Sequence, residues 1–379
     1  MEIRLNRSAF LAEVALMQGI VERKSTIPVL SHILLSCSGD QLQIAATDLD
    51  VSLTSSCDGE VAKEGGIAVQ ARKFMEIIRS VVGDDVLLSQ EDEKRLTITA
   101  GKSRFKINGL QPEDFPTLPT VPEDGQLEID FGRLRNMISK ILFAVSTEES
   151  RFQLNGALLK LKDGGVEIVA TDGHRLALVE NDIEGVSSDD QGVLVPRKAL
   201  QELLRFEGDG KLVFRRSDHH LSFRLGRREL IGRILEGTFP DYERVITKDN
   251  DRHVEFDRKT LGEAVQRVAL LTGDRSRAVR LRFHGAGLEV SATNPDLGEA
   301  REEVDCDWVQ EVDGDWVHSD TEREEFSIGM NPDYLAQFVS AVDTDKVRLE
   351  LKDENTQCVC HPVDGSDSRY LCVIMPMRI

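Results

Sequence analysis

The sequence has no long run of apolar residues. Positions 141–145 are typical of its longest runs, whereas a membrane-spanning helix needs about 20 such residues. The first residues, Met-Glu-Ile-Arg, have neither the basic start nor the apolar core of a signal peptide. We therefore expect a cytoplasmic protein without a membrane partner.

Cysteine is scarce, and its spacing is not that of a metal site. Six cysteines occur, and none forms a C-x-x-C pair or a zinc-ribbon spacing. Cys358 and Cys360 stand two residues apart, which would place both thiols on one face of a strand. We interpret all six as free thiols in a reducing cytosol, and we expect no bound metal and no cofactor.

The glycine motifs of nucleotide-binding and hydrolytic enzymes are also missing. Neither G-x-G-x-x-G nor G-x-S-x-G occurs. Gly-Lys-Ser at 101–103 resembles the end of a phosphate-binding loop, but position 96, where that motif has glycine, is leucine. This segment therefore does not predict a nucleotide site.

One turn, Thr-Asp-Gly-His-Arg at 171–175, is the strongest candidate for an active site, because histidine can serve as a base or a metal ligand. No further histidine or carboxylate cluster stands nearby at a metal-ligand spacing. The corresponding turns elsewhere in the chain contain no histidine. A structural or binding role is favoured over catalysis here, and His219 and His220 are expected to be exposed in another turn.

What the chain does contain is an internal repeat. The pattern apolar-x-apolar-x-Ala-Thr-Asp/Asn occurs three times, with its threonines at Thr47, Thr171 and Thr293, which are 124 and 122 residues apart. Phe-Pro at 115–116 returns at 239–240, again after 124 residues. Each copy has the pattern of an alternating strand that ends in a polar turn. Recurrence at a fixed period indicates tandem domains.

Other features keep the same offset within each copy. The expected helices are at 8–18, 72–82, 133–145, 197–206, 258–271 and 332–342. Apolar strands are expected around 33–35, 157–161 and 279–283. We predict three α+β domains, 1–122, 126–247 and 250–379, with strands dominant and two helices on one side of each. An acidic insertion at 306–324 in the third copy predicts a solvated loop.

Charge is distributed unevenly between the helices and the rest of the chain. The formal net charge is −20, which by itself argues against binding to nucleic acid. Yet the helices at 72–82, 133–145, 197–206 and 258–270 hold twelve basic and three acidic residues. A positive helical layer on an acidic body suits a surface that faces a polyanion, although basic residues also commonly decorate solvated helices.

Domain size limits how such units could surround DNA. A unit of this length has a radius of gyration of about 13–14 Å, so it behaves as a sphere about 35 Å across. Three touching spheres enclose a hole of only about 5 Å, whereas six enclose about 35 Å. A DNA duplex is at least about 16 Å across. A ring around DNA, if one forms, therefore requires two chains.

Five short segments carry a resemblance to a known family. They are Leu-Asn-Gly at 154–156, Ala-Thr-Asp-Gly-His-Arg-Leu at 170–176, Val-Pro-Arg-Lys at 195–198, Phe-Pro-Asp-Tyr at 239–242 and Met-Pro-Met-Arg-Ile at 375–379. In their order and spacing, and with its three copies, the whole chain resembles the bacterial beta sliding clamps, the beta subunits of DNA polymerase III.

This resemblance implies a ring-shaped, head-to-tail homodimer around double-stranded DNA, with two helices per domain inside and antiparallel sheets outside. It implies a non-catalytic processivity factor of the DNA polymerase III holoenzyme, which a clamp loader places on primed DNA. The polymerase III alpha subunit and other proteins with a clamp-binding motif would dock through a short peptide. Topological, sequence-independent contact with DNA would hold the polymerase at a high effective concentration.

The resemblance also implies a peptide pocket between the second and third domains that reaches the C-terminus. Its residues would be Leu154, Thr171, Gly173, His174, Arg175, Leu176, Pro240, Arg244, Val245, Val373, Met375, Pro376, Met377 and Arg378. Methionine is flexible and suits varied peptide side chains, and His174 and Arg175 would orient a peptide backbone or carboxylate. A strand expected at 370–374 would hold the tail in place.

Two further surfaces follow from the resemblance. The DNA-facing residues would be Lys24, Arg72, Lys73, Arg151, Phe152 and Arg197. Gln153 departs from an aromatic residue found in relatives, and Glu148 and Glu149 place negative charge nearby. At the dimer interface, the strand at 103–108 would pair with the start of the partner's third domain, so that Phe105 and Ile107 meet Leu270 and Leu271.

Two other functions are consistent with the residues alone. A conventional DNA-binding protein built from repeats would bind short linear duplexes tightly, whereas a clamp would slide off their ends. An enzyme centred on 172–175 would lose turnover on the change His174→Ala, whereas a clamp would lose only peptide affinity.

Overall fold

The computed structural model describes residues 1–22, 26–148, 150–183, 186, 188–273, 277–285, 287–319, 324–365 and 369–379. The chain divides into two compact units. One consists of Met1–Arg135 with Val195–Ile234, and the other of Asn136–Leu194 with Leu235–Ile379. Because this division runs through the second repeat, the limits 1–122, 126–247 and 250–379 stay a prediction.

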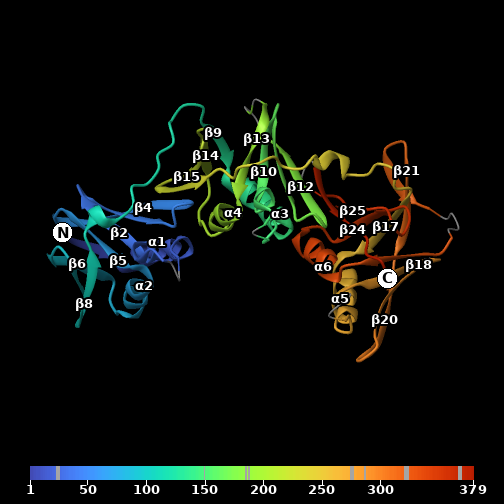
Figure 1. Cartoon of the computed structure of the whole chain (residues 1–379), viewed down its shortest axis with the longest axis horizontal. Helices are drawn as coiled ribbons and strands as arrows, with labels where there is room; N and C mark the ends of the chain where they lie inside the picture. The colour runs from blue at the N-terminus through green and yellow to red at the C-terminus, as the bar shows by residue number, and fades with distance from the viewer. Residues whose placement is uncertain are drawn as a thin grey trace. The chain divides into compact units, whose positions relative to one another are not determined.

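The first unit is built on one antiparallel sheet. Its strands, in pairing order, are β1 (Glu2–Asn6), β6 (Asp85–Asp92), β7 (Arg95–Ala100), β8 (Ser103–Leu110), β5 (Gly65–Gln70), β2 (His32–Ser38), β3 (Gln41–Thr47), β4 (Val51–Lys63), β16 (Arg228–Arg233), β15 (His220–Leu225), β14 (Lys211–Arg216) and β9 (Leu127–Asp130). The helical elements are α1 (Arg7–Ile20), η1 (Pro28–Ser31), α2 (Ala71–Ser80), η2 (Pro112–Asp114) and α4 (Arg197–Leu203). Helices α1 and α2 pack side by side (Figure 1), with Phe10 and Phe74 in edge-to-face contact.

The second unit has two antiparallel sheets. The larger runs β13 (Asp189–Pro196), β10 (Gly156–Lys162), β11 (Gly165–Thr171), β12 (Arg175–Asp182), β26 (Arg369–Ile374), β25 (Cys358–Pro362), β24 (Lys346–Leu351), β17 (Arg252–Asp257), β21 (Asp307–Val312) and β22 (Asp315–His318). The smaller runs β20 (Gly298–Asp305), β19 (Gly287–Asn294), β18 (Val279–His284) and β23 (Phe326–Met330). The helical elements are η3 (Leu142–Ala144), η4 (Phe152–Leu154), η5 (Tyr242–Arg244), α5 (Arg258–Ala269) and α6 (Pro332–Ala341), and α3 (Phe131–Ile141) enters from the first unit.

The first strand of each repeat passes directly into a helix, and its last residue caps that helix. The side chains of Asn6, Asp130 and Asp257 each accept a hydrogen bond from the backbone N–H three residues later, at 3.0, 2.9 and 2.7 Å. Asn and Asp are favoured caps because they satisfy amide groups that lack a helical partner. The helices predicted at 8–18, 133–145 and 258–271 are confirmed as α1, α3 and α5, with ends shifted by a few residues.

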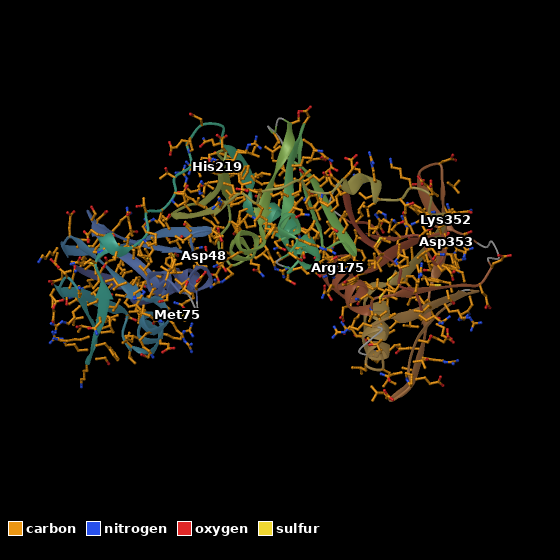
Figure 2. The ribbon with its side chains drawn as sticks, viewed as in Figure 1. Asp48, Met75, Arg175, His219, Lys352 and Asp353 are labelled. Atoms are coloured by element: carbon orange, nitrogen blue, oxygen red, sulfur yellow. The ribbon has the colours of Figure 1, made fainter. Side chains whose placement is uncertain are left out.

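The remaining helix and strand predictions are confirmed in the same way. The helices at 72–82, 197–206 and 332–342 are α2, α4 and α6, each slightly shorter than predicted. The three apolar strands lie within β2, β10 and β18. His219 is exposed in the turn between β14 and β15, as predicted (Figure 2), while His220 is half-buried at the start of β15. No helix in the described part of the chain is long and apolar enough to cross a membrane.

Strand pairing continues from one repeat into the next. In the first unit, β4 of the first repeat pairs with β16, the last strand of the second repeat. In the second unit, β12 of the second repeat pairs with β26, the last strand of the third. The corresponding strand of the third repeat, β20, pairs only with β19 among the described residues. This strand therefore presents a free edge.

The prediction of a solvated loop at 306–324 is wrong for its first part. Residues 307–318 form a hairpin of β21 and β22 that adds to the larger sheet through β17. The turn between them contains Asp313 at φ 53° and Gly314 at φ 92°, and Asp-Gly favours such a tight hairpin turn. Trp308 is buried and donates a hydrogen bond to the carbonyl oxygen of Gly285 at 2.6 Å. Residues 320–323 of the insertion lie outside the described residues.

Candidate functional site

A cavity of about 200 Å³ lies beside β12 and β26 in the second unit. Its lining residues are Leu154, Thr171, Gly173, His174, Arg175, Leu176, Pro240, Tyr242, Val245, Gln357, Val373 and Met375. Ten of these belong to the residues predicted for a peptide pocket. Tyr242 and Gln357 were not predicted, although Tyr242 stands in the Phe-Pro-Asp-Tyr segment that carried part of the resemblance.

The apolar floor of the cavity belongs to the core that joins the second and third repeats. Leu176 on β12 stands opposite Val373 on β26, and both are buried. They pack in one cluster with Tyr242 and Val359, against which Val245 also packs. Because the sheet supplies these side chains in fixed register, the floor is formed without any bound ligand.

The turn at 172–174 forms one rim of the cavity and is held by Asp172. One carboxylate oxygen of Asp172 accepts hydrogen bonds from the backbone N–H groups of His174 and Arg175, at 2.9 and 3.0 Å. Thr171 donates its hydroxyl hydrogen to the carbonyl oxygen of Arg175 at 2.6 Å. Gly173 has φ +90°, a conformation that favours glycine. These bonds fix the exposed His174 at the rim.

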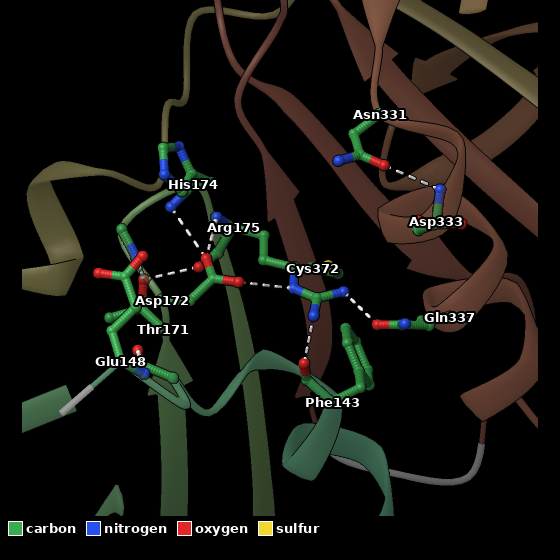
Figure 3. A network of polar contacts seen from close by, with 12 residues as sticks. Phe143, Glu148, Thr171, Asp172, His174, Arg175, Asn331, Asp333, Gln337 and Cys372 are labelled. Atoms are coloured by element: carbon green, nitrogen blue, oxygen red, sulfur yellow. Dashed lines mark hydrogen bonds and ion pairs between the residues drawn. The ribbon is translucent and has the colours of Figure 1, made fainter. Parts of the chain in front are cut away.

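The guanidinium of Arg175 is bonded to several groups of the protein. It donates to the other Asp172 oxygen at 3.1 Å, to the carbonyl oxygen of Phe143 and to the side-chain oxygen of Gln337 on α6 (Figure 3). Its guanidinium also lies 4.3 Å from the ring centroid of Tyr334. Only 9% of the side chain is exposed. Arg175 therefore positions the turn, and its expected role in orienting a peptide stays a prediction.

Tyr242 is held in place by the buried carboxylate of Glu167. Its hydroxyl donates to Glu167, which is 1% exposed and also pairs with Lys162 at 2.6 Å. Burial and the bond to Glu167 raise the pKa of Tyr242. The phenol therefore stays neutral, and its ring is held as a wall of the cavity.

The C-terminal tail is hydrogen-bonded at two points, one of them on the turn at the cavity rim. The backbone N–H of Met375 donates to the carbonyl oxygen of His174 at 3.0 Å, and that of Met377 donates to Gly329 on β23 at 2.8 Å. Four residues predicted for the pocket do not line the cavity. They are Arg244, Pro376, Met377 and Arg378. Arg244 is 85% exposed and pairs with Asp241.

The predicted DNA-facing residues are exposed where the structure describes them, with one exception. Arg72 and Lys73 lie in the first turn of α2, with 77% and 67% of their side chains exposed, and both pair with Glu76. Arg151 and Phe152 are exposed in the loop before β10. Arg197 is half-buried at the start of α4. Lys24 lies outside the described residues.

Several basic residues of the predicted helices form ion pairs within the protein. Lys140 is 5% exposed and pairs with Asp343 at 3.0 Å. Lys198 pairs with Asp48. Arg205 pairs with Glu202 at 2.5 Å and donates to backbone carbonyl oxygens at the end of α1. These three side chains join helices to their surroundings, so they offer less charge to a polyanion than the sequence indicates.

The predicted dimer residues lie at surface positions of different units. Phe105 and Ile107 are half-buried on β8, which over 103–108 has a ladder partner on one side only among the described residues. Leu270, just after α5, is 78% exposed, and Leu271 is half-buried. Such apolar side chains at an open strand edge are typical of an interface.

The six cysteines are free and buried. Burial raises the pKa of Cys57 and Cys306 to about 12, so these thiols are not nucleophiles at neutral pH. Within the described residues, no group of three His, Cys, Asp or Glu side chains is arranged to hold a metal ion.

Comparisons with known proteins agree along the whole chain. The family models of the DNA polymerase III beta subunit match it in succession, the N-terminal domain at residues 1–119, the central domain at 128–241 and the C-terminal domain at 243–378. The beta sliding clamp of Pseudomonas aeruginosa is 37% identical, with both chains covered completely, and that of Caulobacter vibrioides is 35% identical with the same coverage.

Solved structures give the same result. The DNA polymerase III beta subunit of Pseudomonas aeruginosa matches with a TM-score of 0.90 and 36% identity over the whole of both chains. A sliding clamp from that organism bound to griselimycin matches equally well. With three family models in tandem and relatives above 30% identity at full length, the chain belongs to the beta sliding clamps, the DNA polymerase III beta subunits that provide processivity in DNA replication.

Proposed function

We propose that two copies of this chain close head to tail around duplex DNA and that the cavity beside β12 and β26 binds a short peptide of the polymerase III alpha subunit, the clamp loader and other partners. The proposal includes a non-catalytic role, as part of the DNA polymerase III holoenzyme in the cytoplasm. The main observation in favour of a ring is the free edge of β20. The main observation in favour of a peptide site is the apolar cavity, which is formed without a ligand.

The pairing of strands between repeats supports head-to-tail closure. Twice within the chain, the strand after the Ala-Thr-Asp pattern pairs with the last strand of the next repeat, as β4–β16 and β12–β26. The third such strand, β20, has no following repeat, and the last strand of the first repeat, β8, is open over 103–108. Pairing β20 with β8 of a second chain continues the rule, and a repeated head-to-tail contact that closes makes a ring.

Charge supports the same pairing. The outward face of β8 carries Arg104 and Lys106. The exposed residues of β20 include Glu299, Glu303 and Asp305. Opposite charges across neighbouring strands are favourable. The predicted contact of Phe105 and Ile107 with Leu270 and Leu271 would then lie on the other face, although the partner strand is β20 rather than the start of the third domain.

Retention on DNA tests the ring. After loading onto nicked circular plasmid at moderate salt, the protein should remain bound, and linearising the plasmid should release it. Equal retention on circular and linear DNA would indicate direct binding and remove the clamp mechanism. The attraction between exposed basic residues and phosphates should weaken as salt rises, because it depends on counterion release.

Peptide binding tests the cavity. A labelled peptide with the clamp-binding motif of the alpha subunit should bind the dimer and be displaced by griselimycin, the compound bound to the Pseudomonas aeruginosa relative. The change His174→Ala should weaken the peptide without changing the dimer, because His174 is an exposed rim residue. Unchanged affinity would place the peptide elsewhere. Any turnover that His174→Ala abolished would support an enzyme instead.

A further inference from the structure

The segment at 151–154 contains two of the proposed DNA-facing residues, Arg151 and Phe152, and also Leu154, which forms part of the wall of the peptide cavity. Phe152 is 68% exposed, whereas Leu154, two residues later, is 5% exposed and lines the cavity. The backbone N–H of Leu154 donates to the carbonyl oxygen of Arg151 at 2.9 Å, and that of Ser146 donates to Leu154 at 3.0 Å. Because these bonds close the loop into one short structure, the position of Arg151 and that of the cavity wall depend on each other.

The side chain of Arg151 also supports the opposite rim of the cavity. Its Nη1 donates to the carbonyl oxygen of Asp172 at 3.2 Å. A Cβ atom at Gly173 would lie 2.7 Å from this nitrogen, so the guanidinium fits against the turn because glycine leaves room for it. Arg151 therefore contacts the cavity at two places, through its backbone to Leu154 and through its side chain to the turn.

The guanidinium still has donors to offer an anion. Its Nε lies 3.4 Å from the Glu148 carboxylate, and 45% of the side chain is exposed. A guanidinium has five N–H donors in a rigid planar fork, and the contacts with Asp172 and Glu148 engage Nη1 and Nε. A phosphate that approached the exposed edge could bind without breaking the bond to Asp172. It would replace Glu148 as the ionic partner of Arg151.

We propose that Arg151 is a positioning residue that couples the two binding sites, so that a DNA phosphate and a partner peptide strengthen each other's binding. The proposal rests on the proposed function, since it takes the loop to face DNA and the cavity to hold a peptide. A bound phosphate fixes the guanidinium, which orders the turn at 172–174 and the wall at Leu154 before the peptide arrives. The peptide then binds at a lower cost in conformational entropy, and by thermodynamic linkage the peptide strengthens DNA binding by the same factor.

The test measures the affinity of the labelled alpha-subunit peptide for the full-length dimer at low salt, with and without a 24-base-pair duplex. The duplex concentration is set to saturate even the weak binding expected of a clamp, which slides off linear ends. The peptide's dissociation constant should fall by about fivefold or more in the duplex, a coupling at the lower end of those known. In the variant Arg151→Lys, the charge for phosphate remains but the planar fork is lost. Duplex affinity is measured separately for the variant, because Arg151 itself faces DNA, and at saturating duplex the coupling factor should fall to about one.

Arg72→Gln is the matched control, because Arg72 lies on α2 in the other unit and contacts Glu76 rather than the cavity. This change should weaken duplex binding. At saturating duplex, however, the factor by which the duplex strengthens peptide binding should be the same as in the wild type. If the duplex and the peptide bound to the wild type independently, or if each weakened the binding of the other, the proposed coupling would be wrong and the proposed function would still stand. Undiminished coupling in Arg151→Lys would also overturn the proposed coupling through Arg151. A wild-type protein that did not bind the peptide, or that was retained equally on circular and linearised plasmid, would instead remove the proposed function.

Discussion

Two neighbouring residues of one turn, His174 and Arg175, have different roles. The sequence groups them because both are polar and both stand in the segment that carries the family resemblance. In the structure, His174 is exposed at the rim, while Arg175 is buried and bonded to Gln337. These partners are 162 positions apart in sequence, so no local pattern could have predicted that Arg175 supports the turn through Gln337.

Substituting His174 and Arg175 separately tests whether Arg175 supports the fold. Arg175→Ala leaves Asp172, Gln337 and a backbone carbonyl group without their donor, so we expect a loss of about 2–4 kcal/mol in the free energy of unfolding. His174→Ala removes an exposed side chain, and its effect on stability should stay within about 0.5 kcal/mol. Chemical denaturation of both variants would measure the difference. Equal stability of the two would contradict the supporting role of Arg175.

Glu350 provides a pH-dependent contribution to stability. Burial alone would raise the pKa of Glu350, but the hydrogen bond with His361 and the charges of His361, His253 and Arg348 lower it overall. A carboxyl group whose folded pKa is depressed stabilises the fold above its unfolded pKa of about 4.3, and this contribution is lost as pH falls through the folded pKa. The stability difference between wild type and Glu350→Gln should therefore shrink below about pH 4.3. A difference that stayed constant with pH would show that the carboxylate is not responsible.

Among the helices and strands, the sequence predicted the six α-helices of the described residues but only some of the strands. The starts of three helices could be predicted because Asn6, Asp130 and Asp257 cap them, and a capping residue can be recognised from a few neighbouring residues in the sequence. The hairpin of β21 and β22 was not predicted, because the acidic composition of this segment is typical of a solvated loop, whereas its Asp-Gly pair is typical of a hairpin turn. Gln357 was missed for another reason, since it reaches the cavity only through long-range pairing of β25 with β26.

The C-terminal tail is an element whose placement can be tested without touching the cavity. A Cβ atom at Gly329 would lie 2.3 Å from the carbonyl oxygen of Met377, so Gly329→Ala should displace the tail and loosen Met375. We expect peptide affinity to fall by about tenfold, which corresponds to about 1.4 kcal/mol. Fluorescence polarisation with the labelled peptide would measure this. Gly132→Ala, on α3, is the control and should leave peptide affinity unaltered.

For the whole molecule, the continuation of strand pairing from repeat to repeat explains why one chain does not complete the assembly. The sequence alone predicted that two chains are needed, from the size of the repeats. It could not predict β20 as the strand that we propose to pair with a second chain, because the free edge becomes visible only once β4–β16 and β12–β26 are seen to pair. Strand partners far apart in sequence leave no local signal.

The dimer can be tested with a change that spares the monomer. Leu270 is 78% exposed in the single chain, so Leu270→Glu should fold normally yet place a charge in an apolar interface. Sedimentation velocity should show the variant mostly as monomer at concentrations where the wild type is a dimer. Val312→Glu, on the β21–β22 hairpin and 45% exposed, should remain dimeric. A dimeric Leu270→Glu protein would exclude this interface.

The sheets that cross between repeats also bear on how the chain folds. A segment that matches one family model is not necessarily a unit of cooperative unfolding, because the strands of the middle repeat are shared between two compact units. Expressed alone, the middle repeat would expose the edges that β4 and β26 normally cover. The limits of the sequence repeats therefore differ from those of the two compact units, and we expect the compact units to be the pieces of the chain that unfold together.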